Sequence, residues 1–312
     1  MSDTANQLEK TVDETAGERE HRFRLQDYAI LLKPRVMSLV VFTAACGLVL
    51  APGTVSLDTA LIAVICIAAG AGASGAINMW YDQDIDRLMR RTQNRPIPAG
   101  RMHPKEALVF GSLLSVGAVA TMYLFVNWAA ASLLALTILY YVFIYTMWLK
   151  RRTPQNIVIG GASGAFPPMI GWAAVTGDIG LGAIAMFAII FLWTPPHSWA
   201  LALFRRGDYA AADVPMMPVV AGERETKRQI LVYTVLLIAA TLSPVAIGMS
   251  GAVYGAVAAG LGIEFWRRCW RVWKDDEAEE RTAKPLFLFS ILYLFLIFVA
   301  LLIDRFVFIP VL

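Results

Sequence analysis

The chain has 312 residues, of which 58% are hydrophobic and only 16% are charged. About a quarter of the residues of an ordinary soluble domain are charged, so this composition excludes that class and favours a membrane protein. The formal net charge of +3 requires no nucleic-acid partner, because orientation in a membrane and contact with anionic lipid account for it.

Residues 1–27 are polar and charged throughout. We expect a disordered N-terminal tail there, without a signal peptide. The remaining residues, 28–312, are expected to form one transmembrane domain, because long uncharged runs follow one another to the end of the chain.

About 20 apolar residues are enough for a helix to cross a bilayer. Two of the uncharged runs are long enough for a pair of helices each, with breaks expected near Asn127 and across 248–251. We therefore predict an all-α polytopic bundle with nine transmembrane helices. The uncharged runs are 36–57, 59–81, 107–149, 153–177, 179–204, 229–263 and 286–303.

The positions of the basic residues test that count independently. With nine spans, all of the 27 lysines and arginines except Arg305 fall on one side of the membrane. Cytoplasmic loops carry an excess of basic residues, so the N-terminus and the long connections are predicted to be cytoplasmic. A bacterial-type inner membrane is favoured over an organellar one, because no transit peptide is evident.

Three cysteines, Cys46, Cys66 and Cys269, lie in or next to predicted helices without metal-binding spacing. An odd and scattered set argues against a disulfide framework and against a zinc site, and favours apolar helix packing. Small residues crowd the segment 68–76, which permits a close approach between helices.

An acidic stripe ends the second predicted helix. Asn78, Asp82 and Asp86 are spaced four residues apart, so on a helix they share one face about 12 Å long. Two carboxylates at this spacing repel each other, and ionisable groups near a membrane are costly. A Mg²⁺ ion completed by substrate phosphates would stabilise them. The basic residues that could bind the remaining phosphate oxygens are Arg87, Arg90, Arg91 and Arg95.

A second charged segment, 205–227, follows the sixth predicted helix. It supplies the carboxylates of Asp208 and Asp213, and basic side chains follow at Arg224, Lys227 and Arg228. Two acidic motifs in separate connections suggest a diphosphate held between two metal-binding faces. The alternative is that these are solvated loops whose basic residues only follow the positive-inside distribution.

His197 is the only histidine inside a predicted span, and it follows Pro195 and Pro196. Because proline removes backbone donors, we expect the helix to bend or break there and to open a cavity, as at Pro167 and Pro168. His197 could then ligate or hydrogen-bond a haem. The alternative is a packing histidine whose ring is satisfied by a neighbouring helix.

No Ser-His-Asp arrangement, G-x-G-x-x-G fingerprint or Walker-type motif is visible in the sequence. Ionisation of an allylic diphosphate requires none of them, because a metal and basic residues stabilise the departing diphosphate. An apolar cavity would then hold the carbocation and its acceptor.

The stripe N-x-x-x-D-x-x-x-D, read from Asn78, resembles the first motif of the UbiA superfamily of intramembrane prenyltransferases. Further stretches resemble one branch of it, the protoheme IX farnesyltransferases or haem O synthases, and they follow in order from the first to the seventh predicted helix. They are K-P-R-V (33–36), D-R-L-M-R-R-T-Q-N-R-P-I-P-A-G (86–100), L-K-R-R-T-P-Q-N-I-V-I-G-G-A (149–162), P-P-H-S-W-A-L-A (195–202) and D-Y-A-A-A-D-V-P-M-M-P-V-V (208–220).

The resemblance implies nine spans around a central cavity. It also implies Mg²⁺-dependent transfer of farnesyl from farnesyl diphosphate to a vinyl group of haem B, with addition of water, to give haem O. Haem B is then a substrate and not a cofactor. Catalytic roles are implied for Asn78, Asp82, Asp86 and Asp208, with Asp82, Asp86 and Asp208 as metal ligands, whereas Asp213 has little support in the family. Substrate-binding roles are implied for Arg91, Arg95, Lys150, Asn156, His197, Tyr209 and Lys227.

Two alternatives stay open on the sequence. A related prenyltransferase acting on a quinone precursor would share the first motif but would have no use for a haem contact. A transporter would use intramembrane carboxylates for ions and proline-broken helices for gating, yet these carboxylates cluster at one membrane face. The expected partners are farnesyl diphosphate, haem B, the lipid bilayer and, as a further candidate, a haem A synthase, with no nucleic acid.

Overall fold

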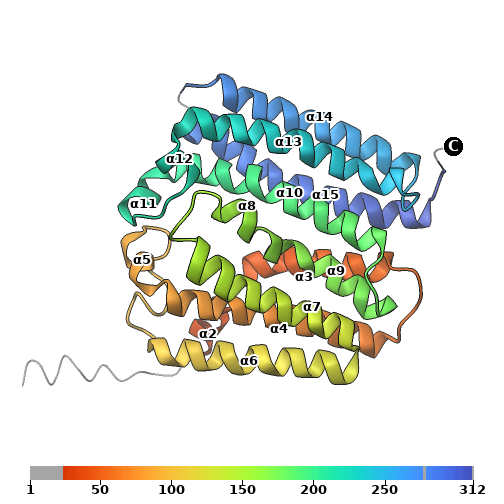
Figure 1. Cartoon of the computed structure of the whole chain (residues 1–312), viewed down its shortest axis with the longest axis horizontal. Helices are drawn as coiled ribbons and strands as arrows, with labels where there is room; N and C mark the ends of the chain where they lie inside the picture. The colour runs from red at the N-terminus through yellow and green to blue at the C-terminus, as the bar shows by residue number, and fades with distance from the viewer. Residues whose placement is uncertain (1–23, 277–278, 311–312) are drawn as a thin grey trace, which may run out of the picture.

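The computed structural model describes residues 24–276 and 279–310, and this part of the chain is helical without any β-strand (Figure 1). The prediction of an all-α fold is therefore confirmed. Most of the predicted N-terminal tail, residues 1–23, lies outside the described residues. The first helix begins at Leu25, so its first three residues fall within the predicted tail.

Long helices form the bundle and short helices connect them. The short elements are α2 (Leu25–Leu31), α5 (Gln83–Leu88), α8 (Asn156–Gly160), α11 (Arg206–Ala211), α12 (Met217–Val220) and the π-helical turn η2 (Glu279–Ala283). The long elements are α3 (Pro34–Leu50), α4 (Leu57–Tyr81), α6 (Pro104–Phe125), α7 (Trp128–Leu139) with its π-helical continuation η1 (Tyr140–Leu149), α9 (Ala162–Thr176), α10 (Leu181–Phe204), α13 (Gly222–Ala246), α14 (Ala252–Lys274) and α15 (Lys284–Phe306).

Seven helices among the described residues have the length and apolar composition to cross a membrane, and the bent pair of α2 and α3 would make eight. α14 coincides with a further predicted span but does not meet the same criterion, because its C-terminal half carries Glu264 and four basic residues. The chain is thus a multi-span membrane bundle, and the count of nine spans stays a prediction.

Both breaks expected within the longest uncharged runs are confirmed. α7 begins directly after Asn127, whose side-chain oxygen accepts a hydrogen bond from the backbone of Ala130 at 2.8 Å. Asparagine is a favoured N-cap for this reason. α13 and α14 are joined through Gly248, which has a φ of 70°, a left-handed conformation that suits glycine. Short polar and glycine signals therefore end helices that hydrophobicity alone would continue.

The proline pairs do not break their helices. α9 continues through Pro167 and Pro168, and α10 continues through Pro195 and Pro196. α10 packs against both α13 and α15, and such tertiary packing overrides the weak helix preference of proline. The sequence predicts that a bend or break at Pro195 and Pro196 opens a cavity. Because α10 is continuous there, no break in this helix opens one.

Close crossings hold the middle of the bundle together. α4 packs against α6, α3 against α9, and α13 lies against both α10 and α14. A Cβ atom on Gly47 would lie 1.9 Å from the carbonyl oxygen of Pro168, and one on Gly171 would lie 2.1 Å from that of Ala44. The α3–α9 crossing therefore requires glycine on both helices, as small residues commonly allow in membrane bundles.

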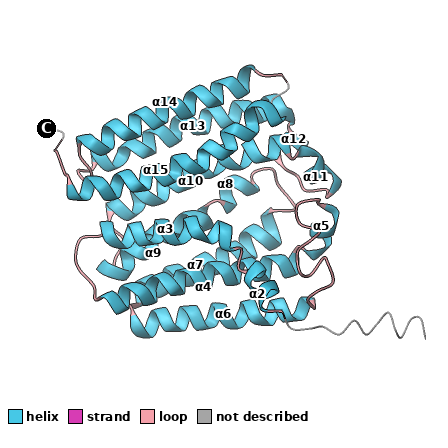
Figure 2. Ribbon diagram, turned by 180° about the vertical axis from the view of Figure 1, so that it is seen from behind, coloured by secondary structure: helices cyan, strands magenta, loops and turns pink. Residues whose placement is uncertain are grey.

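The three cysteines are buried and free, which confirms their assignment to helix packing. The sulfur of Cys269 on α14 lies 3.2 Å from the hydroxyl oxygen of Thr234 on α13. One end of the bundle gathers the short helices α5, α11 and α12, as both views show (Figures 1 and 2). The charged connections of the sequence therefore meet at that end.

Candidate active site

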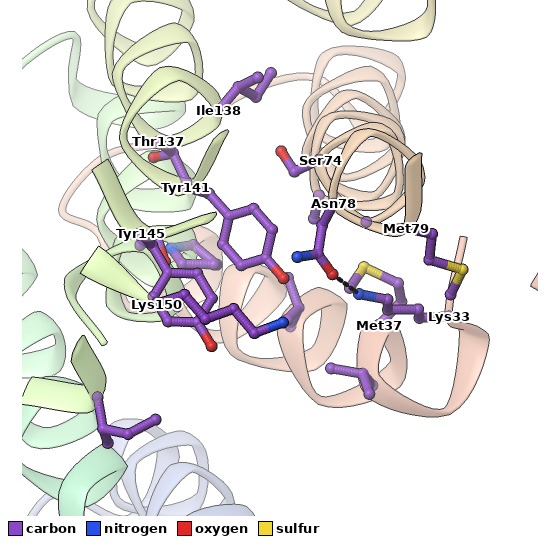
Figure 3. A pocket seen from close by; sticks show the side chains of 18 of the residues that line it. Lys33, Met37, Ser74, Asn78, Met79, Thr137, Ile138, Tyr141, Tyr145 and Lys150 are labelled. Atoms are coloured by element: carbon purple, nitrogen blue, oxygen red, sulfur yellow. Dashed lines mark hydrogen bonds between the residues drawn. The ribbon is translucent and has the colours of Figure 1, made fainter. Parts of the chain in front are cut away.

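A cavity of about 720 Å³ lies inside the bundle near the end that α5 and α11 cover. Along α4 its lining passes from Ile67 through Ala71 and Ser74 to Asn78, so the wall changes from apolar to polar toward α5. Figure 3 shows the polar part, where the side chains of Asn78, Lys33, Tyr141 and Lys150 converge. The cavity thus offers an apolar chamber with a polar end.

The predicted acidic stripe forms at that polar end. α4 ends just before Asp82 and α5 begins just after it, yet the backbone hydrogen bonds from Asp82 to Asn78 and from Asp86 to Asp82 both measure 2.9 Å. The helical spacing therefore continues across the junction, as the sequence predicts. All three side chains are buried, and Asn78 and Asp86 line the cavity.

Basic side chains neutralise the buried carboxylates. Lys150 forms an ion pair with Asp82, and Nη1 of Arg95 lies 2.6 Å from Oδ2 of Asp86. Asn78 also donates a hydrogen bond of 2.6 Å to Asp82. A buried charge without a partner is strongly destabilising, so these contacts explain how two carboxylates are accommodated here. In the structure, the positive charge beside these two carboxylates comes from Lys150 and Arg95.

The lining of the cavity carries a surplus of positive charge. Its basic residues are Lys33, Arg91, Arg95 and Lys150, whereas Asp86 is the one acidic residue among those that line it. Lys33 donates a hydrogen bond of 2.9 Å to Oδ1 of Asn78 (Figure 3). Its φ of 51° lies in the left-handed region, and such strain is concentrated at functional sites. An anionic ligand is the species that this arrangement attracts.

Arg151 clamps α5 to the connection that follows η1. Its two terminal nitrogens each lie 2.7 Å from one oxygen of Asp84, and Nη2 lies 3.4 Å from Oδ1 of Asp82. The bidentate hydrogen bond lowers the pKa of Asp84 below its ordinary value and raises the pKa of Arg151. Arg151 therefore holds Oδ1 of Asp82, while Lys150 pairs with Oδ2 of the same carboxylate.

Three further residues implied by the resemblance also reach the cavity. Lys150 does so beside the stripe, and Asn156 and Tyr209 line the wall near it. Asn156 is fully buried and donates to the carbonyl oxygen of Thr153 at 2.6 Å, while its Oδ1 has no partner among the described residues. Burial raises the pKa of Tyr209, which keeps its hydroxyl protonated as a donor.

The segment 205–227 is not brought to the cavity as a second acidic face. Asp208 is half-buried and outside the lining, although the next residue, Tyr209, lies within it, because successive side chains on a helix point in different directions. Asp213 is exposed. Lys227 donates to the carbonyl oxygen of Asp275 at 2.6 Å. No group of three or more His, Cys, Asp or Glu side chains placed to hold a metal occurs within the described residues.

His197 packs between two helices. Its Nδ1 lies 2.7 Å from the hydroxyl oxygen of Ser290 on α15. The imidazole stacks between Trp193 and Phe287, with ring centroids 4.2 and 4.6 Å away. His197 is not among the residues that line the cavity. The structure therefore gives it the contacts of a packing residue, and a haem contact stays a prediction.

Four residues of the site were not assigned from the sequence: Lys33, Tyr141, Tyr145 and Arg151. Lys33 directly precedes a proline, a position that favours a helix junction. The two tyrosines are spaced four residues apart, as are Asp82 and Asp86, and their ring centroids lie 5.3 Å apart on the π-helical element η1. Such π-helical turns are frequent at functional sites. The proline after Lys33 and the four-residue spacing of the tyrosines are visible in the sequence. Only the assembled bundle shows that these side chains reach the cavity.

Comparison with known families decides the class of this protein. Residues 40–303 match the UbiA prenyltransferase family. The chain belongs to that family. The UbiA assignment confirms the resemblance drawn from the N-x-x-x-D-x-x-x-D stripe, and the matched residues include most of those that line the cavity.

Close relatives of this UbiA chain carry one name. A protoheme IX farnesyltransferase from Parvibaculum lavamentivorans is 57% identical over 98% of this chain and 96% of its own length. Another with that name, from Sinorhizobium fredii, is 60% identical over 89% of this chain and 88% of its own.

Solved structures share the fold. One, of a digeranylgeranylglyceryl phosphate synthase in membranes, covers 90% of this chain and 98% of its own with a TM-score of 0.74 at 18% identity. A UbiA homologue from Archaeoglobus fulgidus bound to DMAPP and Mg²⁺ covers 88% and 99% with a TM-score of 0.63 at 16% identity. At these identities the likeness establishes the fold alone.

Proposed function

We propose that this UbiA-family protein is a protoheme IX farnesyltransferase, which transfers farnesyl from farnesyl diphosphate to a vinyl group of haem B to give haem O. The observation that carries the proposal is the buried acidic stripe, of which Asn78 and Asp86 line the polar end of an apolar cavity beside a basic surplus, with Asp82 between them along the chain. A prenyl diphosphate has the matching shape, with an anionic head and an apolar tail. The shared name of the close relatives supports haem B as the acceptor.

The oxygen atoms of the stripe fit a divalent metal, because Mg²⁺ is commonly held by one or two carboxylates and completed by phosphates. Asp82 and Asp86, assisted by Asn78, would hold Mg²⁺, which when bound supplies charge neutralisation to the departing diphosphate. Lys150 and Arg95 would then exchange their carboxylate partners for phosphate oxygens, as charged donors at the same wall can do. Asp208 is proposed as a third carboxylate beside Tyr209.

The rest of the site would guide the carbon chemistry. The carbon–oxygen bond to diphosphate breaks, the haem vinyl attacks the allylic cation, and water captures the resulting cation with loss of a proton. The apolar wall around Ile67 and Leu134 would exclude other water from the farnesyl chain. Tyr141 and Tyr145 present aromatic faces that can stabilise a nearby cation.

The acceptor half of the site is proposed on the resemblance. Arg91, Asn156 and Tyr209 line the cavity and would contact substrate directly. His197 and Lys227 have partners on or near α15 and α14, so a role in haem binding requires those contacts to exchange. The proposal includes nine spans with a cytoplasmic N-terminus in a bacterial inner membrane, and a haem A synthase as a partner that receives the product.

The test is product formation by the purified chain. With farnesyl diphosphate, haem B and Mg²⁺, extraction and chromatography of the haems should reveal a farnesylated, hydroxylated species, and removal of the metal by a chelator should stop its formation. Prenylation of 4-hydroxybenzoate in place of haem would support the quinone-precursor alternative instead. Ion flux into vesicles without any prenylated product would support a transporter.

A further inference from the structure

A basic and aromatic face covers the C-terminal half of α14. Trp266, Arg267, Trp270 and Arg271 line a second hollow of about 320 Å³, which we call the α14 face. Both arginines are exposed, and Trp270 is 41% exposed. Positions three and four apart on a helix are neighbours, so these side chains form one continuous surface. None of them lines the active-site cavity.

The α14 face lies at the rim of the bundle. α14 forms its outer edge and packs on α13 and α15, and its C-terminal end lies at the same end of the molecule as α5, α11 and α12 (Figures 1 and 2). The apolar half of α14 precedes this end, and the charged half reaches it. A helix edge of that composition meets both the acyl chains and the head groups of a bilayer.

The charge on this face is only partly balanced. Glu264 lies 2.8 Å from both Arg267 and Arg268, so one carboxylate serves two guanidinium groups. Arg271 has no ion-pair partner among the residues that the structure describes. The nitrogen of Lys274 lies over the ring of Trp270, 5.6 Å from its centroid. A phosphate would complement this surplus, because guanidinium groups bind phosphate bidentately.

The aromatic side chains of the α14 face indicate which kind of anionic molecule binds there. Trp266 and Trp270 stack with centroids 6.1 Å apart and planes inclined by 20°, and Ile263, one turn nearer the apolar half, is 64% exposed. Tryptophan rings favour the head-group level of a membrane. A soluble acidic protein would meet the arginines but would leave the apolar side chains beside them uncovered.

We propose that the α14 face binds an anionic phospholipid, with its phosphate between Arg267 and Arg271 and its acyl chains along Trp266 and Ile263. The site is separate from the farnesyl diphosphate cavity. It does not depend on the proposed reaction, because lipid binding is measured without substrate. The occupied face would fix the depth at which the C-terminal hairpin of α14 and α15 sits in the membrane.

The test compares lipid binding by the purified full chain in neutral detergent, read by native mass spectrometry. Dioleoyl phosphatidylglycerol is the anionic probe, and dioleoyl phosphatidylcholine is its zwitterionic match. The double variant Arg267→Gln/Arg271→Gln should bind phosphatidylglycerol about 30-fold more weakly, since each basic residue near anionic lipid contributes roughly fivefold. The double variant Arg267→Lys/Arg271→Lys retains the charge and should lose less.

The control is Arg206→Gln/Arg228→Gln, which removes the same charge from two exposed arginines on α11 and α13 and should bind phosphatidylglycerol like the parent chain. Equal affinity of the parent for the two lipids would overturn the proposal. So would an equal loss in the control variant, because the binding would then reflect net charge. A change in oligomeric mass with unchanged lipid binding would identify the face as a contact between copies and would also overturn it.

Discussion

Asp82 illustrates how single residues serve both stability and chemistry in this site. It is fully buried and accepts hydrogen bonds from Asn78 and Arg151 while it pairs with Lys150. Removing one partner of a buried pair costs more than the pair contributes, because the other charge is left uncompensated. Alanine at this position would therefore confound folding with catalysis, and the isosteric amide is the sharper probe.

Asp82→Asn and Asp86→Asn should each reduce haem O formation at least about 100-fold, because an amide cannot neutralise Mg²⁺ or anchor it between the diphosphate and the helix. The rate should be measured with purified protein at limiting Mg²⁺. Asp58→Asn is the control, since Asp58 is exposed in the first turn of α4 and does not line the cavity. Near-normal turnover in the Asp82 or Asp86 variant would contradict the proposal that these carboxylates hold Mg²⁺.

His197→Ala should impair the use of haem B and also lower the stability of the α10–α15 contact by about 1–3 kcal/mol, because the partner of Ser290 and two stacking surfaces are lost. His197→Phe separates the two effects, since a phenyl ring preserves the stack without a nitrogen. Thermal unfolding and the Soret spectrum of haem-loaded protein measure them. Normal haem O formation and an unchanged spectrum in a stable His197→Phe protein would show that His197 contributes to helix packing only.

At the scale of elements, the bundle depends on groups that fit at one crossing or one helix end. At the α3–α9 crossing, neither Gly47 nor Gly171 has room for a Cβ atom. At the opposite end of the bundle from α5, the fully buried carboxylate of Asp304 on α15 accepts the backbone donors of Gly251 at 2.6 Å and Tyr254 at 3.0 Å. That contact caps the first turn of α14 from a neighbouring helix.

Gly47→Ala should destabilise the protein by about 1–3 kcal/mol or more, because the added methyl group would overlap the backbone of Pro168 and force α3 and α9 apart. Thermal unfolding in detergent measures the loss. Gly117→Ala on α6 is the matched control, since nothing lies within 4 Å of a Cβ there. It should be neutral or slightly stabilising, as alanine favours a helix over glycine. Equal unfolding temperatures for the two variants would contradict the close crossing.

Asp304→Ala should lower the free energy of unfolding by about 1–3 kcal/mol, because two buried backbone donors of α14 would lose their acceptor. Asp304→Asn keeps one oxygen and should cost less. Hydrogen exchange at the first turn of α14 measures the effect directly, and the exchange of α6 provides an internal reference. Unchanged protection at Gly251 and Tyr254 in the alanine variant would show that the cap contributes nothing.

At the scale of the whole molecule, α14 decides the membrane topology, because it determines on which side of the membrane the end of α15 lies. Seven or eight helices qualify as spans by length and composition, and α14 does not. If α14 crosses the membrane, Arg305 and the connection around Arg152 lie on opposite sides. If it does not, they share a side. The even or odd number of crossings between these two positions therefore decides the topology.

Single cysteines introduced at Arg152 and Arg305 should react with a membrane-impermeant thiol reagent from opposite sides of sealed vesicles. Both positions are exposed, and the three native cysteines are buried, so background labelling should be low. We expect Arg152→Cys to react from the cytoplasmic side. Labelling of both positions from one side would reject nine spans and place α14 along the membrane surface.

Local signals determined much of this protein. Run length and composition predict membrane helices, Asn127 and Gly248 predict the ends of helices, and the four-residue spacing of Asp82 and Asp86 predicts one shared face. Each of these depends on interactions within one or two helical turns, which is why a single segment of sequence contains the information.

The tertiary structure decided which charged residues meet. Lys33 and Lys150 reach the same wall from distant segments, while Asp208 and Lys227 do not line it and His197 binds α15. The direction of a side chain depends on how its helix is rotated and what packs against it. Those rotations are set by crossings such as that of α3 and α9, where the partner lies far away in the sequence, so no single segment could have revealed them.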